Sequence, residues 1–300
     1  MKVGLVLPQG WMQEYRGHSS PHAWANTVAV AQAAEHSGFE SVWMYDHFHT
    51  WPQPEDAIVF EPFVALSALA ALTERVRLGH IVVCTGFRNP ALTAKMIATL
   101  DVVSDGRAEL GIGAGWKREE WEAFGYDFPP TRERLATLAE HLEIITRMLD
   151  STTDERATYS GSRARVKGAI NQPKPLQAPR VPIMVGGNGP NVTWRLAAEY
   201  ADELNLDGLD PAAVAEALPV IRSRCDEIGR DPTTLKVSVH TWYEDPGVSQ
   251  RGRRRQDLFA AYAELGVHRV QTYVDGLAEG NDALDAFAED LRVAGVSLTR

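Results

Sequence analysis

The chain has 300 residues, of which 44% are hydrophobic and 23% charged, and its formal net charge is −10. This acidic balance excludes a general nucleic-acid binder, because attraction to phosphates requires a basic face. The length suits one large domain or two modest ones, and no window approaches the run of about eighteen apolar residues that a membrane span requires.

Apolar runs of strand length, rich in β-branched residues, recur along the chain at fairly even spacing. They are continuous rather than alternating, which is typical of parallel strands whose outer face is covered. In chain order, we expect strands at residues 3–7, 41–45, 76–83, 108–112, 183–185, 203–206, 236–240 and 269–273.

Segments with helical periodicity lie between these runs. Several begin with proline or with an Asn, Asp or Thr cap, and glycines such as Gly38 and Gly229 follow others where a C-terminal glycine belongs. In chain order, we expect helices at residues 24–37, 62–72, 90–104, 131–150, 190–200, 211–228, 257–265 and 284–294.

Strands that alternate one by one with helices predict an α/β fold, and the simplest closed arrangement is a (β/α)8 TIM barrel. A doubly wound open sheet is the main competitor. We expect a single domain over residues 1–300. Residues 151–182 interrupt the rhythm between the fourth helix and the fifth strand, and an insertion of this length is usually functional or a lid.

The carboxyl ends of the strands are where active sites form in such barrels. Asp46 and His47 stand where the buried run Ser41–Tyr45 stops, so they open into the barrel mouth. They are either a strand-end cap or a chemical pair. Glycine clusters follow two further strands, at residues 111–115 and 186–192, where backbone amides could hold a phosphate or a ring edge. Tight bends would also explain these glycines.

Tryptophans are concentrated in the same predicted mouth loops. A single Trp there would most often be packing, whereas several predict an apolar pocket for a planar cofactor or substrate. The four residues are Trp11, Trp51, Trp116 and Trp242.

The N-terminal segment and the cysteines indicate a compartment. The opening residues MKVGLVLPQG are too short for the apolar region of a signal peptide and lack a cleavage site. Cys84 and Cys225 lie far apart, which fits a reducing cytoplasm better than a disulfide framework. We therefore expect a cytoplasmic protein.

The stretch TGFRNPALTAKMIATLDVVSDGRAELGIGAGWKREEWEAFG, residues 85–125, resembles the signature of the bacterial luciferase-like superfamily. More specifically, it resembles the class that depends on the deazaflavin coenzyme F420. FPPTRERLATLAEHLEIITRML and PRVPIMVGGNGPNVTWRLAAEYADELNL continue the likeness, which extends from the first strand to about Leu206.

The resemblance implies a deazaflavin ring across the carboxyl end of the barrel and a homodimer. His47 then matches an acid–base residue beside the ring, and Asp46 its neighbour in the family's Asp-His pair. Residues 80–82 match a bulged strand with a non-prolyl cis peptide behind the ring. The implied cofactor-binding residues are Asp46, His80, Ile81, Val82, Gly113, Gly115, Gly186, Gly187, Asn188, Asp207 and Gly208.

One departure matters for the substrate. The sugar-phosphate dehydrogenases of this class have a Glu where this chain has Trp116, which fits an apolar or aromatic substrate better. We expect hydride transfer between the deazaflavin C5 and a small organic molecule, with His47 moving the accompanying proton. Asp46 would orient a loop or a ring substituent, because adjacent residues on a strand point apart.

Three alternatives stay open. An FMN-dependent luciferase-like monooxygenase would keep the fold and change the cofactor. A metal-dependent hydrolase would use His47 and His49 as an HxH ligand pair, but no histidine lies between His141 and His240 to complete the site, so we expect no metal. A non-catalytic flavin binder would show no turnover. The direction of hydride transfer is not indicated.

Overall fold

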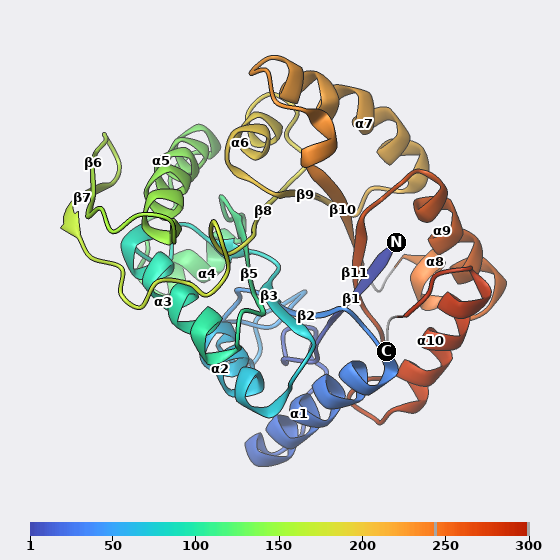
Figure 1. Ribbon diagram of the computed structural model, residues 1–300. Coiled ribbons are helices and arrows are strands. Elements are labelled where there is room, and N and C mark those ends of the chain that lie inside the picture. Colours follow the sequence, from blue (N-terminus) through green and yellow to red (C-terminus); the bar gives the residue numbers. More distant parts are fainter. Residues whose placement is uncertain (243–244, 299–300) are drawn as a thin grey trace.

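The computed structural model describes residues 1–242 and 245–298, and this part of the chain forms a closed barrel surrounded by helices (Figure 1). The barrel strands are β1 Lys2–Val6, β2 Ser41–Met44, β3 Arg77–His80, β4 Val83–Cys84, β5 Ala108–Gly113, β8 Ile183–Gly186, β9 Glu203–Asp207, β10 Lys236–Thr241 and β11 Arg269–Tyr273.

All the pairings between these strands are parallel, in the order β3-β2-β1-β11-β10-β9-β8-β5-β4. β3 also pairs with β5, which closes the sheet, and β4 continues the third barrel strand. The predicted (β/α)8 TIM barrel is confirmed. The expected single strand over 76–83 is wrong in detail, because it is interrupted between His80 and Val83.

The helices that cover the barrel are α1 Ser20–Ser37, α2 Pro62–Leu72, α3 Pro90–Val103, α5 Thr131–Leu149, α6 Thr193–Tyr200, α7 Pro211–Asp226, α9 Arg253–Glu264 and α10 Asp282–Val293. Each corresponds to an expected helix, with ends that differ by a few residues. The sequence-based prediction did not include the short helices α4 Arg118–Ala123 and α8 Pro246–Ser249 or the 3-10 turn Pro232–Thr234. Among the described helices, none has the length and apolarity needed to cross a bilayer.

Proline and a capping side chain fix the start of several helices. Glu61, Asn89 and Asp210 accept a hydrogen bond from the first turn of α2, α3 and α7, and proline follows each of them. These helices begin where the sequence predicts, because both signals are local.

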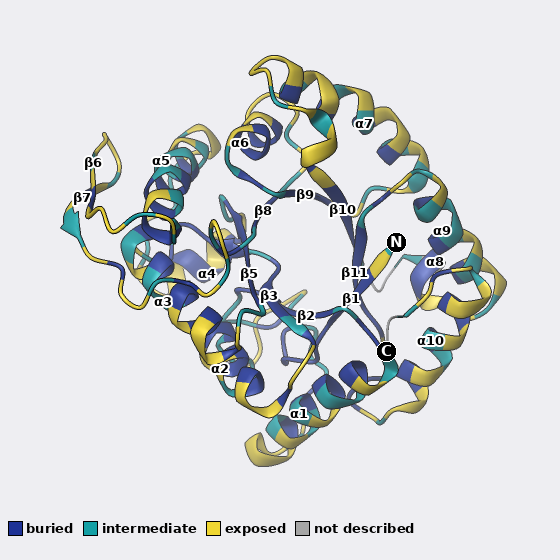
Figure 2. Cartoon of the chain, viewed as in Figure 1, coloured by how far each residue is buried: buried dark blue, intermediate teal, exposed yellow. Residues whose placement is uncertain are grey.

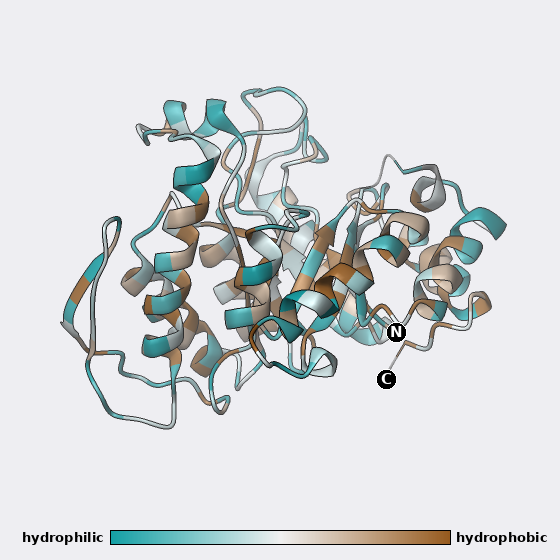
Figure 3. Ribbon diagram, turned by 90° about the horizontal axis from the view of Figure 1, so that it is seen from above, coloured by the Kyte–Doolittle hydropathy of each residue, from teal (hydrophilic) through white to brown (hydrophobic). Residues whose placement is uncertain are grey.

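Apolar side chains on the outer face of the strands pack against the inward faces of the helices, and the outward faces of the helices are exposed (Figure 2). Hydrophobic residues gather on the strands and on the inward helix faces (Figure 3). Inside the barrel, Trp43 fills space that two glycines leave open. A Cβ at Gly79 would lie 2.2 Å from the Trp43 ring, and one at Gly4 would lie 2.4 Å from its Nε1. Small residues at these two positions are therefore required by the packing.

Buried ions close the amino end of the barrel. Arg269 lies 2.6 Å from Glu109, 3.2 Å from Glu40 and 3.7 Å from Glu203, and Arg77 also pairs with Glu109. Burial raises the pKa of Glu109, but Arg269 and Arg77 lower it further, so the carboxyl stays below its usual range. This cluster is a plug in which each charge has a partner.

Residues 151–182 contain a hairpin, with antiparallel strands β6 Ala157–Ser160 and β7 Arg165–Ala169, that projects beside α5 (Figure 1). Glu140 of α5 holds its turn by accepting hydrogen bonds from the amides of Ser162, Arg163 and Ala164. The hairpin residues Arg163 and Arg165 line an outer groove with residues 85–90, and neither arginine is among the residues that line the barrel mouth described below.

Candidate active site

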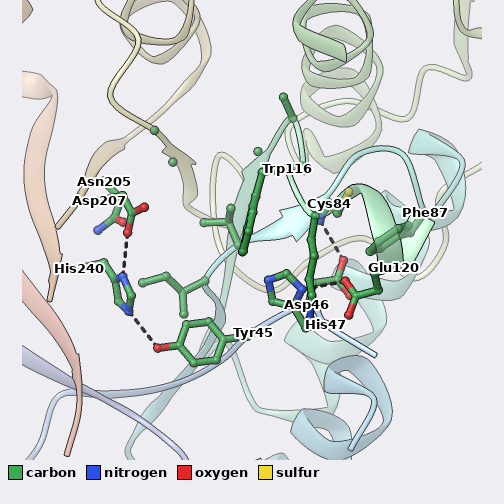
Figure 4. A pocket seen from close by; sticks show the side chains of 18 of the residues that line it. Tyr45, Asp46, His47, Cys84, Phe87, Trp116, Glu120, Asn205, Asp207 and His240 are labelled. Carbon is green, nitrogen blue, oxygen red and sulfur yellow. Dashed lines mark hydrogen bonds and ion pairs between the residues drawn. The ribbon is translucent and has the colours of Figure 1, made fainter. Parts of the chain in front are cut away.

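A cavity of about 270 Å³ opens at the carboxyl end of the barrel. Its lining brings together side chains from the loops after most of the barrel strands (Figure 4). The predicted site residues that line it are Trp11, Asp46, His47, Ile81, Val82, Gly113, Gly115, Trp116, Gly186, Gly187, Asp207 and Trp242.

Four predicted site residues lie outside this lining as the structure describes it. His80 packs on Phe63 of α2, with ring centroids 4.1 Å apart, and burial lowers its pKa to about 3. Trp51 packs behind Trp116, and Gly208 lies beside Trp242.

The fourth is Asn188, which braces Asp207. Its Nδ2 donates to the Asp207 carbonyl at 2.7 Å, and its Oδ1 accepts from the Asp207 amide at 2.9 Å. Both polar ends of this side chain are therefore committed to the backbone of the neighbouring strand, β9.

The expected non-prolyl cis peptide is present between Ile81 and Val82, and both residues line the cavity. Glycines face them from neighbouring strands. A Cβ at Gly113 would lie 2.9 Å from a Val82 methyl group, and one at Gly186 would lie 3.0 Å from the other. Gly187 has φ 132°, which a side chain disfavours. This wall is built largely of backbone and small side chains, so a flat ring could approach it closely.

Asp46 is buried and committed to the scaffold. Its Oδ2 accepts from the Cys84 amide at 2.8 Å and from Arg88 Nη1 at 2.7 Å, while Oδ1 accepts from Arg88 Nη2 at 3.0 Å. Arg88 also pairs with Glu61 at 2.8 Å. Burial works to lower the pKa of Arg88, but Asp46 and Glu61 raise it above its usual value. Asp46 thus ties β2 to the loop after β4, which supports the interpretation that it orients a loop.

His47 points the other way and lies against aromatic rings. It is stacked on Trp11, with centroids 4.5 Å apart and planes 5° apart, and Trp116 meets it edge-on at 5.7 Å. Its Nδ1 lies 2.7 Å from Glu120 Oε2. Among the described residues, Nε2 has no hydrogen-bond partner, so this nitrogen is the one left for a ligand.

Glu120 is a candidate site residue that the sequence prediction missed. Its side chain is fully buried, and its Oε1 accepts from the Phe48 amide at 2.6 Å and the His49 amide at 2.8 Å. Burial raises the pKa of Glu120, but the hydrogen bond and charge of His47, with the two amides, bring it below its usual value. The carboxylate therefore fixes both the ring and the loop that carries it.

The opposite side of the cavity carries a second polar chain (Figure 4). The Tyr45 hydroxyl lies 3.0 Å from His240 Nε2, and His240 Nδ1 lies 3.0 Å from Asp207 Oδ1. Asp207 is about half exposed, whereas Tyr45 is buried under Trp242, which stacks on it with planes 6° apart. This chain connects the cavity with solvent.

The HxH reading of His47 and His49 finds no support in the geometry. His47 faces Glu120, while the His49 ring packs on Phe124 with centroids 5.3 Å apart. Over residues 1–242 and 245–298, no group of three or more His, Cys, Asp or Glu side chains is placed to hold a metal ion.

Comparison with known proteins decides the family. A family model described as luciferase-like monooxygenase matches residues 1–243. The chain belongs to the luciferase-like monooxygenase family. Within this family, the F420-dependent glucose-6-phosphate dehydrogenase of Kineococcus radiotolerans is 38% identical over 249 residues, which are 80% of this chain and 71% of that protein.

Solved structures agree on the fold of this luciferase-like chain. An F420-dependent secondary alcohol dehydrogenase, in complex with an F420–acetone adduct, has a TM-score of 0.81 at 21% identity and matches 98% of both chains. A long-chain alkane monooxygenase has a TM-score of 0.78 at 14% identity, over 100% of this chain and 92% of that one. At such identities the likeness establishes the luciferase-like barrel alone.

Proposed function

We propose that this luciferase-like protein is an F420-dependent oxidoreductase that transfers hydride between the deazaflavin C5 and a small apolar or aromatic substrate. The observation that carries the proposal is the His47–Glu120 pair, which lines the same cavity as glycine backbone and the Ile81–Val82 segment. The name of the Kineococcus relative supports the same cofactor.

The residues present fit a planar cofactor. Ile81, Val82, Gly113 and Gly187 would hold one face of its ring, because their small or flat surfaces allow close approach. The bound deazaflavin would supply the carbon that carries the hydride. The protein would then position the substrate against that carbon and exclude water.

His47 would take up or deliver the proton that accompanies the hydride, at Nε2. Glu120 holds Nδ1 and stabilises the charged imidazole when the proton is on the ring. Trp11, stacked on the ring, keeps water from one face. Asp46 would contribute by fixing the loop rather than by transferring a proton.

A titration tests the cofactor. Purified protein is mixed separately with oxidised F420 and with FMN, and cofactor fluorescence is followed. We expect micromolar or tighter binding of F420 and at least about tenfold weaker binding of FMN, a difference of about 1.4 kcal/mol. An FMN-dependent monooxygenase is the alternative, favoured by the description of the matched family as luciferase-like monooxygenase. Tight FMN binding without F420 binding would favour it.

We further propose a homodimer that buries the exposed faces of α2 and α3. Large apolar side chains are exposed there, among them Val64 of α2, which is 73% exposed, and Leu92 and Val103 of α3. The two helices lie side by side on the barrel (Figure 1). Light scattering should give twice the chain mass of 33.1 kDa, and Val64→Glu should give monomers. A monomeric wild type at micromolar concentration would contradict this.

The cytoplasmic location stays part of the proposal. Cys84 and Cys225 are both free and buried, which is consistent with a reducing compartment.

A further inference from the structure

Lys117 is a buried cation in the lining of the cavity. It directly follows Trp116 in the loop between β5 and α4, and only 5% of its surface is exposed. Its Nζ donates to the Thr50 carbonyl at 2.9 Å and lies 5.9 Å from the centre of the Trp51 ring. The ammonium group therefore lies beside the loop that carries His47.

This ammonium group has no carboxylate of its own. Over the described residues, no carboxylate oxygen lies within 4.0 Å of Lys117 Nζ, whereas Arg88 and the neighbouring Arg118 are both ion-paired. Glu120 is the neighbouring acid, but both of its oxygens are taken by His47 and by the Phe48 and His49 amides. Glu120 and Glu119 therefore act on the ammonium group only from beyond ion-pair distance. A buried charge without a direct ion pair is costly, which favours a ligand that supplies one.

The hydrogen-bonding capacity of Lys117 points the same way. An ammonium group has three N–H donors, and the Thr50 carbonyl is the acceptor that the described residues provide. Because Lys117 is one of the residues that line the cavity, an oxygen anion of a bound molecule could accept from the remaining donors.

The aromatic rings near Lys117 indicate the shape and polarity of the rest of the ligand. Trp51 and Trp116 meet edge-on at 5.2 Å beside Lys117, and Trp116, about half exposed, reaches over His47. A molecule held between Lys117 and His47 would lie along the Trp116 ring, which lines the cavity and has Trp51 packed behind it. Its body should be planar and apolar, and its far end should carry a single negative charge.

We propose that Lys117 binds the carboxylate of a planar, aromatic or unsaturated monocarboxylate, and that this is the substrate class of the cavity. The inference rests on the proposed function, since the same cavity must hold cofactor and substrate. A sugar phosphate fits less well, because a dianion needs several cations and Lys117 is the one Lys or Arg in the lining as described.

Matched ligands test the proposal. Benzoate, trans-cinnamate and 4-phenylbutanoate are each titrated by calorimetry against the wild-type protein, alongside their uncharged amides, without cofactor and again with F420. We expect at least one carboxylate to bind about tenfold or more tightly than its amide, as a hydrogen bond to a charged group would give. Added salt should weaken binding of the carboxylate and leave binding of the amide unchanged.

Variants then assign the preference to Lys117. Lys117→Met should bring the carboxylate-to-amide ratio to about one. Arg118→Met removes the adjacent charge, which pairs with Glu122 on the exposed side of α4, and should keep the wild-type ratio. Thermal unfolding of both variants controls for loss of the Thr50 contact, and the ratio is compared only within one protein.

Two results would overturn the proposal. One is that none of the three carboxylates binds the wild type more tightly than its amide, and the other is that Lys117→Met keeps the preference. The same experiments distinguish failure of this proposal from failure of the proposed function. If the protein binds F420 but shows no carboxylate preference, only the role of Lys117 is rejected. A carboxylate preference that depends on Lys117, without F420 binding, rejects the cofactor and keeps the anion site.

Discussion

The two ends of the barrel both bury charged side chains, but they balance them differently. At the amino end, Arg269 lies among Glu109, Glu203 and Glu40, each within 3.7 Å. At the carboxyl end, His47 and Glu120 form a hydrogen-bonded pair in the lining of the cavity. Lys117 beside them has no carboxylate partner within ion-pair distance among the described residues.

This difference in charge balance distinguishes buried charges that contribute to stability from those that bind a ligand. A closed cluster whose charges neutralise one another has no reason to bind anything else, and its removal should cost stability. An unbalanced set beside a cavity is expected where a ligand completes it, because structures keep costly buried charges at functional sites. Burial of charge alone therefore does not mark an active site, whereas incomplete neutralisation next to an opening does.

The largest effect should come from removing the proton carrier at the open end. His47→Ala should lower turnover by about 10²–10⁴-fold, the range for loss of general acid–base catalysis, with little change in F420 affinity. His49→Ala is the control, because its ring packs on Phe124 and its amide, which Glu120 holds, is kept. A fall in turnover of only two- or threefold for His47→Ala would mean that the His47 ring contributes packing and transfers no proton.

The closed end should respond in stability instead. Arg269→Met leaves Glu109 and Glu203 buried without their main partner and should lower the free energy of unfolding by about 3–5 kcal/mol. Urea unfolding measures this. Arg292→Met, which removes an exposed pair with Glu289, should cost less than about 1 kcal/mol. Equal losses of unfolding free energy in the two variants would contradict the larger stabilising role assigned to the buried Arg269 cluster than to the exposed Arg292–Glu289 pair.

Replacing the positioning carboxylate should have an intermediate effect on catalysis. Glu120→Gln keeps an oxygen for the Phe48 and His49 amides but removes the negative charge beside His47. Turnover should fall by about ten- to a hundredfold, since a hydrogen bond to a charged group contributes about 1.5–3 kcal/mol. The limb of the pH–turnover profile that reports the pair should move to lower pH. An unchanged profile would contradict this role.

The smallest effect concerns the pH dependence of stability. The pKa of Glu109 lies below its ordinary value of 4.5, because Arg269 and Arg77 outweigh the effect of burial. The stabilisation from this carboxylate is thus complete above about pH 4.5 and is lost as pH falls through the folded pKa. Wild type should lose about 2 kcal/mol more than Glu109→Gln between pH 7 and pH 3 in urea unfolding. Parallel curves would contradict the prediction.

The sequence predicted the barrel because its signals are local and repeated. Continuous apolar runs specified the parallel strands, and Pro62, Pro90 and Pro211 marked the starts of three helices. The misses lie where such signals are short. Helix α4 has six residues, less than two turns, so no periodicity can be read from it. The hairpin at residues 157–169 lies on the outside and has little apolar surface to specify it.

The candidate site was predicted in part for the same reason. His47 was found because a buried strand stops at a charged pair. Glu120 was missed because the sequence REEWEA offers two adjacent carboxylates, and only the helix phase shows that Glu120 is buried while Glu119 is exposed. His80 was assigned to the cofactor although it follows Gly79, which faces Trp43 inside the barrel, so alternation directs the His80 ring outward.

A crystal structure of the complex with oxidised F420 tests the central claim most directly. We expect the deazaflavin ring in the cavity at the carboxyl end, with one face on Ile81 and Val82 and with His47 Nε2 directed at the side where the substrate binds. A ring bound elsewhere on the molecule, or one that leaves His47 Nε2 facing protein, would contradict it.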